Sequence, residues 1–352
     1  QTSPLHVKER GEMRHRFLGS MSILAILVAV VSPATVSLAG QARTAAGKKG
    51  APPRTPWGAP DLQGVWIGST LTPMERPKEL AGKQFLTAEE AATLEDKAAH
   101  NQFVDRAPAA GDPGTYNQVW FDNGIKVVPD RRTSLIVDPP DGRIPWKPGA
   151  RNAIGTTLRI GPFNRPVDLD TGERCLTDGL PMLRLGYNPN SLIVQTPDYV
   201  VILHEMFHDR RIIPLNGRPH GTIPQWNGDI RGRWDGDTLV VETANFFDKT
   251  QYRWATTWKA PSETMRLVER FTRVDPETLE YQFTLEDPSK FTRPWTAIIP
   301  QTTNQAARGV TAGVLYEYAC HEGNYAMVNV LKGARAQEKA AEEVARLRRE
   351  AQ

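Results

Sequence analysis

The stretch Ile230-Arg-Gly-Arg-Trp-Asp-Gly-Asp-Thr-Leu-Val-Val-Glu-Thr243 decides the fold class of this chain. Asp235-Gly236 is a strong turn signal, and the flanking segments 230–234 and 237–243 carry the β-branched and aromatic residues that strands favour. The pattern therefore predicts a β-hairpin that turns at Asp235-Gly236.

Similar patterns recur on both sides of this hairpin. After it, residues 265–274 alternate, with Leu267, Glu269 and Phe271 on one face, and a turn at 275–278 returns the chain through 279–285. Further strands are predicted at 61–68, 133–138, 191–196, 199–203, 211–215, 295–299 and 314–319. Because the strands follow one another with short turns and little helix, we expect a mainly β protein. Its antiparallel meander closes into a barrel or sandwich with a few peripheral helices.

Two helices are predicted outside the strands. Thr87-Ala-Glu-Glu90 is a capping box, in which the threonine and Glu90 satisfy each other's backbone N–H groups, and it precedes a helix over 88–101. The last segment, 333–352, is rich in Ala, Glu, Lys and Arg and predicts a polar C-terminal helix.

The first sixty residues divide into a leader and a linker. Residues 1–39 are expected to be upstream sequence and a signal peptide: Met13 opens a basic stretch, 22–31 is apolar, and Ser37-Leu-Ala39 is a small-x-small cleavage site. Residues 40–60 form a flexible linker, and 61–332 form a single β-rich domain. We therefore expect a bacterial protein that is exported to the periplasm or secreted.

Composition narrows the classes of partner. The net charge is only +3, part of it lies in the leader, and the domain has no basic stripe interleaved with aromatics, so no nucleic-acid partner is expected. No segment after the leader is apolar enough for a membrane helix, so we expect no stable membrane insertion after signal cleavage. The expected partner is a small-molecule ligand or substrate.

The chain has two cysteines, Cys175 and Cys320. In an exported protein such a pair predicts a disulfide. A metal-thiolate or nucleophile pair stays open as the alternative, although neither cysteine has a second one at Cys-x-x-Cys spacing.

Several segments resemble a family of uncharacterised exported bacterial proteins. The resemblance covers nearly all of the chain after the leader. It implies export and implies that both cysteines belong to the family's pattern, but it implies no activity. The segments that carry it include PWGAPDLQGVW (56–66), GRWDGDTLVVET (232–243) and YEYACHEGNY (316–325). In architecture alone, Gly64-x-Trp66 in the first strand and a helix after the last strand resemble the lipocalin plan.

His204-Glu205-Met-Phe-His208 matches His-Glu-x-x-His, the zinc motif of metalloproteases. The motif works on a helix, which places both histidines on one face. The preceding run, 199–203, instead predicts a strand, in which His204 and His208 would lie about 13 Å apart. A helix over 197–211 starting at Pro197 is the alternative. Both stay open, and with them a zinc-dependent hydrolase.

A broader set of titratable residues falls at predicted strand ends. Histidine beside a carboxylate can act as a general base near neutral pH, and several histidines can bind a divalent metal such as zinc. The first hypothesis is therefore an exported enzyme, of hydrolase or lyase/isomerase type, that acts on a small organic molecule. Its catalytic candidates are Glu205, His208, His220, His321 and Glu322, and the metal candidates are His204, His208 and His220.

The alternative is a non-catalytic, lipocalin-like binder of a hydrophobic or aromatic ligand. The chain has nine Trp and eight Tyr. These rings can line a cavity or simply fill a β-protein core. The tryptophans in question are Trp66, Trp226, Trp234, Trp254, Trp258 and Trp295.

Overall fold

The computed structural model describes residues 52–101, 122–150, 163–183, 186–247, 258–259, 262–306 and 315–351. The chain falls into two compact units, Gln1–Ala45 and Ala46–Gln352, and all described residues belong to the second. The predicted signal peptide and its cleavage site lie outside the described residues.

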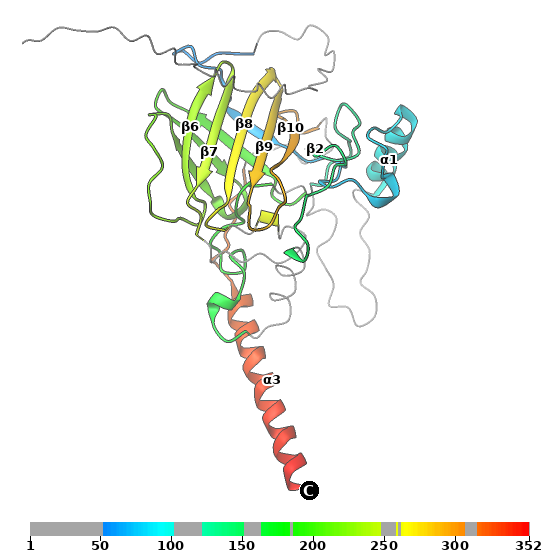
Figure 1. Cartoon of the computed structure of the whole chain (residues 1–352), viewed down its shortest axis with the longest axis vertical. Helices are drawn as coiled ribbons and strands as arrows, with labels where there is room; N and C mark the ends of the chain where they lie inside the picture. The colour runs from blue at the N-terminus through cyan, green and yellow to red at the C-terminus, as the bar shows by residue number, and fades with distance from the viewer. Residues whose placement is uncertain are drawn as a thin grey trace, which may run out of the picture. The chain divides into compact units, whose positions relative to one another are not determined.

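The described part of the chain is mainly β, as predicted. Ten strands form one sheet (Figure 1). Nine of them are hydrogen-bonded side by side in the order β5-β4-β3-β1-β10-β9-β8-β7-β6, which we call the main path, and β2 pairs with β10 beside it. Neighbouring strands pair antiparallel, and the sheet curls into a nearly closed barrel. The strands are β1 (Gly64–Ile67), β2 (Ile136–Asp138), β3 (Asn190–Gln195), β4 (Tyr199–His204), β5 (Arg210–Pro214), β6 (Asp229–Asp235), β7 (Thr238–Ala244), β8 (Arg266–Asp275), β9 (Thr278–Glu286) and β10 (Trp295–Thr302).

The hairpin predicted at 230–243 is present as β6 and β7. Asp235 pairs with Thr238, so the two-residue loop is Gly236-Asp237, one position later than the sequence suggested. Gly236 has a φ of +58°, in the left-handed region that glycine enters without a Cβ clash. The location of the turn was therefore predicted to within one residue.

The α-helices in the described part of the chain are α1 (Ala88–Asn101) and α3 (Tyr325–Glu350). The helix at 88–101 is confirmed, and its capping box forms: Thr87 N donates to Glu90 Oε2 at 2.8 Å and Glu90 N donates to Thr87 Oγ1 at 3.2 Å. No described helix is both long and apolar enough to cross a bilayer.

The C-terminal helix starts earlier than predicted. It begins at Tyr325 rather than 333, because the Asn324 side chain accepts a hydrogen bond from Met327 N and caps the first turn. Gly333, taken as a helix boundary in the sequence, lies inside the helix. The strand predicted at 314–319 is wrong, since no strand is present over 315–319.

Residues 197–211 form a strand and a turn, so the alternative of a helix is wrong. The β-branched run is β4, a short 3-10 helix follows at Met206–His208, and β5 returns antiparallel to β4. Phe207 and His208 have φ values of +60° and +48° and reverse the chain direction.

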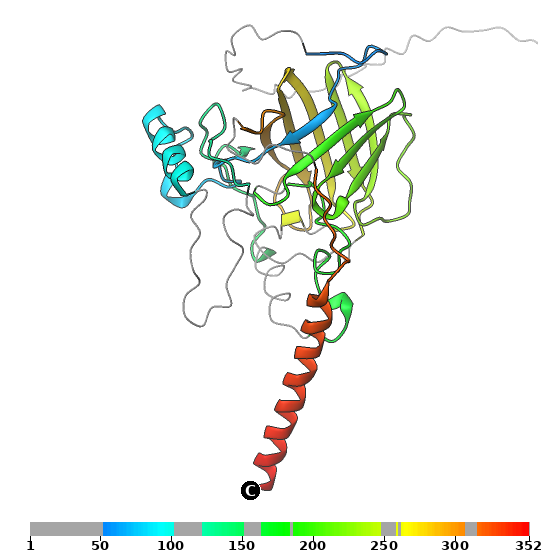
Figure 2. The ribbon, with the colours of Figure 1, turned by 180° about the vertical axis from the view of Figure 1, so that it is seen from behind.

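The odd number of strands on the main path explains how the barrel closes. Nine strands follow one another antiparallel along the main path, so the two end strands, β5 and β6, run in the same direction. Parallel neighbours cannot be joined by a tight hairpin, and residues 215–228 make a long connection instead, beside β6 in Figures 1 and 2. No strand pairing joins β5 to β6. We call this junction the seam.

The seam is closed by packing. A Cβ on Gly232 of β6 would lie 2.5 Å from Ile213 Cγ2 and 2.9 Å from Leu215 Cδ2, so a larger residue there would displace these two side chains.

Aromatic side chains fill the barrel interior. Trp66, Trp295 and Phe283 are fully buried, and the rings of Phe283 and Trp295 lie 5.3 Å apart in an edge-to-face arrangement. Trp258 stacks on Phe283 in the same core. Trp234 packs partly against that core, Trp226 lies outside the barrel core cluster, and Trp254 is outside the described residues.

Candidate functional site

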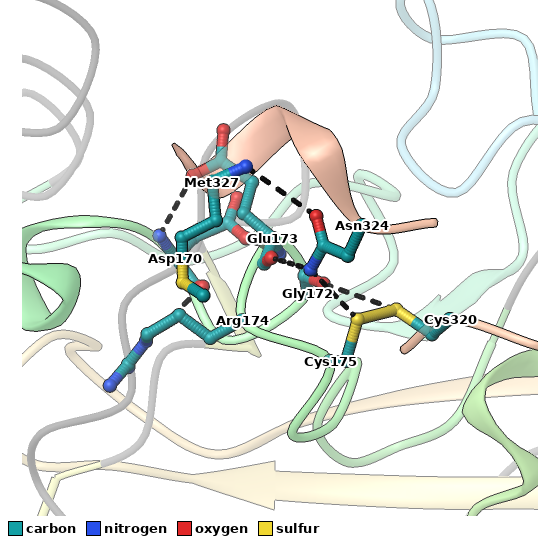
Figure 3. Close-up of a disulfide and its surroundings, with 8 residues drawn as sticks. All are labelled: Asp170, Gly172, Glu173, Arg174, Cys175, Cys320, Asn324 and Met327. Atoms are coloured by element: carbon teal, nitrogen blue, oxygen red, sulfur yellow. Dashed lines mark hydrogen bonds between the residues drawn. A yellow bond between two sulfur atoms is a disulfide. The ribbon is translucent and has the colours of Figure 1, made fainter. Parts of the chain in front are cut away.

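The predicted disulfide is present between Cys175 and Cys320, with a Cα–Cα distance of 5.7 Å (Figure 3). Asn324 Nδ2 donates to Glu173 O at 2.9 Å beside it. The start of α3 is thus fastened covalently and by hydrogen bonds to the loop at 170–176.

His204 and Glu205, the first two residues of the His-Glu-x-x-His match, are buried in separate polar contacts. His204 Nδ1 lies 2.8 Å from Ser191 Oγ, and its Nε2 is buried without a hydrogen-bond partner among the residues that the structure describes. Burial lowers the pKa of His204 far below 6.5, and the nearby charges of Arg211 and Lys259 lower it further, so the imidazole is neutral. Glu205 accepts hydrogen bonds from Asn188 and Asn190 and anchors β3 to the end of β4.

Near the disulfide, the β4–β5 turn, which carries His208, contacts the segment before Cys320, and His321 follows that cysteine. Tyr318 N donates to His208 Nδ1 at 3.2 Å, and the Tyr318 ring packs against Phe207 at 4.9 Å. His321 and Glu322 follow Cys320 and are exposed. These contacts bring the 318–322 segment to the β4–β5 turn but leave His204 and His220 with other neighbours.

The predicted metal sites do not assemble in the described part of the chain. No group of three or more His, Cys, Asp or Glu side chains there is placed to hold a metal ion. The helix that a His-Glu-x-x-His zinc site requires is replaced by β4 and the turn after it. His204, His208 and His220 contact Ser191, Tyr318 and Asp229 instead.

A groove of about 920 Å³ runs along the outside of the seam. Its walls come from β5, from the start of β6, from the connection before β6 and from the loop after Cys175. The lining residues are Leu176, Tyr199, Asp209, Arg210, Arg211, Ile212, Pro214, Asn216, Arg218 and 224–231. We call this the seam groove.

Positive charge dominates the seam groove. Arg231 pairs with Asp229 at 2.6 Å, and Arg211 pairs with Glu269 inside the barrel. Arg210 and Arg218 are exposed, and neither guanidinium has an ion pair or hydrogen bond within the residues described. Two unpaired cations therefore share this groove.

Apolar surface lies beside these cations. Tyr199 and Ile212 are both exposed on the outer faces of β4 and β5. Trp226 is half-buried, held by the Arg174 guanidinium 5.6 Å from its ring centre and by the edge of Phe247. The groove thus offers a fixed aromatic ring next to guanidinium groups.

Asp209 lies on the groove wall and holds it together. Its carboxylate accepts from Thr177 Oγ1 at 2.5 Å and from Asn227 Nδ2 at 2.8 Å. Burial raises the pKa of Asp209, and these hydrogen bonds act in the opposite direction by stabilising the carboxylate. Asp209, in the β4–β5 turn, therefore ties the segment just after Cys175 to the connection before β6.

Among the predicted catalytic residues, His220 contacts a residue that lines the seam groove, although His220 itself does not line it. Its Nδ1 lies 3.4 Å from Asp229 Oδ2, and Asp229 itself lines the groove. Asp229 also accepts from Gly221 N at 2.5 Å, which fixes the carboxylate beside the imidazole. The sequence pointed to His220 but gave no reason to pair it with Asp229.

Arg218 and Asn227 were missed, and Trp226 was named only as a possible cavity-lining ring, because the seam is what brings these residues to β5. Their shared signal was position: all three lie in the long connection after the Asn216-Gly217 turn, and long connections often carry function.

Comparison with models of protein families, with curated proteins and with solved structures finds no match to this chain.

Proposed function

We propose that this is an exported β-barrel protein that binds a small organic anion carrying a ring in the seam groove. The observation that carries the proposal is a pair of guanidinium groups, Arg210 and Arg218, that have no partner among the described residues and lie in the same groove as Trp226. Export is proposed from the sequence of the leader, and the disulfide is consistent with an oxidising compartment.

The charge balance favours an anion. Arg231 and Arg211 are neutralised by Asp229 and Glu269. Asp209 directs its oxygens to Thr177 and Asn227, which are neutral donors. A carboxylate, sulfonate or phosphate on the ligand would supply the missing negative charge, and guanidinium groups bind these anions through paired hydrogen bonds.

The ring is proposed from the apolar part of the groove. Trp226, Tyr199 and Ile212 present aromatic and aliphatic surface beside the arginines. The filled barrel interior makes this outer groove a better binding site for a ring than a central lipocalin-type cavity.

Calorimetry with 1-naphthoate tests the proposal, and 1-naphthamide, of the same shape but uncharged, is the matched ligand. We expect the naphthoate affinity to fall about tenfold in Arg210→Gln/Arg218→Gln, equivalent to about 1.4 kcal/mol. Arg233→Gln is the control, because Arg233 lies on β6 outside the groove and pairs with Glu242. Naphthoate binding that is equally strong in the double variant, or equal affinity for the amide, would refute the proposal.

A second candidate function is acid–base catalysis, favoured by the His220–Asp229 contact at the groove. A carboxylate beside one imidazole nitrogen leaves the other nitrogen available as a base. We would measure hydrolysis of 4-acetoxybenzoate, in which His220 would take a proton from the water that attacks the ester carbonyl. Turnover that disappears in His220→Gln while naphthoate binding persists supports an enzyme, and absence of turnover leaves the binding protein.

A further inference from the structure

We infer that a second anion site, for a phosphate or phosphomonoester group, lies in a pocket lined by Arg76, Lys78 and Arg143. The pocket has a volume of about 430 Å³ and lies between the segments 76–84 and 140–143. It shares no lining residue with the seam groove, so this inference is independent of the proposed function.

Arg76 forms the floor of the pocket. The residue is only 6 % exposed, and its guanidinium is fixed by two hydrogen bonds, from Nε to Thr133 Oγ1 at 2.9 Å and from Nη1 to Pro140 O at 3.0 Å. The acceptors are neutral, and Nη2 has no partner among the described residues. A buried guanidinium that meets only neutral oxygens keeps its full positive charge uncompensated.

Arg143 is held next to Arg76. Its Nη1 donates to the backbone oxygen of Arg76, and its backbone N donates to Asp141 Oδ1 at 3.0 Å. No carboxylate forms an ion pair with Arg76, Lys78 or Arg143 in the described part of the chain. With three cations and Asp141 as the one acidic residue in the lining, the pocket carries an excess of about two positive charges at neutral pH.

The backbone holds Arg76 and the turn that carries Arg143 together before any ligand binds. Arg76 N donates to Gly142 O at 2.8 Å, which ties the two walls together. Gly142 has a φ of +69°, and a Cβ there would lie 2.4 Å from Ser134 Oγ and 3.1 Å from Arg76 Cβ. Only glycine therefore allows the 140–143 turn to sit against Arg76. The guanidinium groups of Arg76 and Arg143 are thus kept close together by hydrogen bonds to uncharged groups.

A doubly charged anion matches this arrangement better than a single carboxylate. Phosphate and phosphomonoesters carry a charge of about −1.5 to −2 near pH 7 and offer three or more acceptor oxygens. Three donors from different parts of two loops can bind such oxygens at once. The walls at Pro77, Ala81 and Pro140 leave room for an organic substituent.

Equilibrium dialysis with inorganic phosphate and, separately, with phenyl phosphate tests the site. Lys78→Gln/Arg143→Gln should weaken binding at least about tenfold and leave naphthoate binding at the seam groove unchanged. Arg76 is retained because it also supports the fold. Arg293→Gln, an exposed arginine paired with Asp138 outside the pocket, should bind like the wild type.

The two ligands separate free phosphate from a phosphorylated molecule. Saturable binding of either ligand that the double variant loses supports the site, and binding of phenyl phosphate alone assigns it to a phosphomonoester. If the double variant does not fold, Lys78→Gln alone, which removes an exposed side chain, should weaken binding about threefold. Absence of saturable binding up to about 10 mM of either ligand, or equal binding in the folded variants and the wild type, overturns the inference.

Discussion

Arg211 on β5 and Glu269 on β8 form a bidentate ion pair across the barrel interior. Arg211 Nη1 donates to Glu269 Oε1 at 2.9 Å, Nη2 donates to Oε2, and the two side chains are 1 % and 0 % exposed. Tyr281 OH on β9 donates to Glu269 Oε1 at 2.8 Å. Since β5 ends the sheet on one side of the seam, the pair fastens that edge to β8, the third strand on the other side of the seam.

Removing one partner of this pair should lower the stability of the fold. Glu269→Gln leaves the guanidinium of Arg211 buried without a countercharge, and we expect the free energy of unfolding to fall by about 3–5 kcal/mol. Urea denaturation measures this. Glu286→Gln, at the exposed end of β9, is the control and should change the value by less than about 0.5 kcal/mol. A cost for Glu269→Gln as small as that of the control would mean that the pair does not support the seam.

His204 should make the protein less stable in acid. Its pKa in the folded state lies far below 6.5, because of burial first and then the charges of Arg211 and Lys259. Below about pH 6.5 the unfolded chain therefore binds a proton at this position that the folded chain does not. The stability contributed by the neutral imidazole is present above that pH and is lost as the pH falls toward the folded-state pKa.

The measurement is the free energy of unfolding of the wild type and of His204→Gln between about pH 7 and pH 5. The wild type should lose up to about 1.4 kcal/mol per pH unit more than the variant. Comparing the two removes the contributions of other groups, including Asp209, whose raised pKa acts in the opposite direction. Parallel curves for the two proteins would show that His204 is protonated in the folded state.

The disulfide should stabilise the fold mainly by restricting the unfolded chain. It joins residues 145 apart, and in the chain-entropy model a loop of this length contributes up to roughly 5 kcal/mol. We expect Cys175→Ser/Cys320→Ser to lose about 2–5 kcal/mol in urea denaturation. It should also be cleaved faster by trypsin within α3, which buries none of its residues. Unchanged cleavage of α3 would show that its other contacts suffice to hold it.

Local patterns carried most of the fold prediction. The alternation through β8 and β9, the turn between β6 and β7 and the capping box of α1 depend on neighbours in the sequence. All three are present, the turn one residue later than predicted. The start of α3 was misplaced because glycine at 333 is tolerated within a helix while Asn324 supplies the cap.

The candidate site was less predictable because it depends on closure of the sheet. Arg210 and Arg218 lie in one groove because β5 and β6 meet at the seam, where they run parallel and do not pair. This arrangement follows from the odd number of strands, which no local sequence pattern reveals. Glu269 did give a signal: it shares a face with Leu267 and Phe271, where a buried charge needs a partner. Its partner, Arg211, is 58 residues away and could not be chosen from the sequence.

Charge reversal in the seam groove tests the central claim most directly. Arg210→Glu/Arg218→Glu should exchange the preference of the protein, so that 1-naphthylmethylammonium binds more tightly than 1-naphthoate, whereas the wild type prefers naphthoate. The ratio of the two dissociation constants, measured by calorimetry at low salt, gives the answer without depending on overall stability. An unchanged ratio would contradict binding of an organic anion by these two arginines.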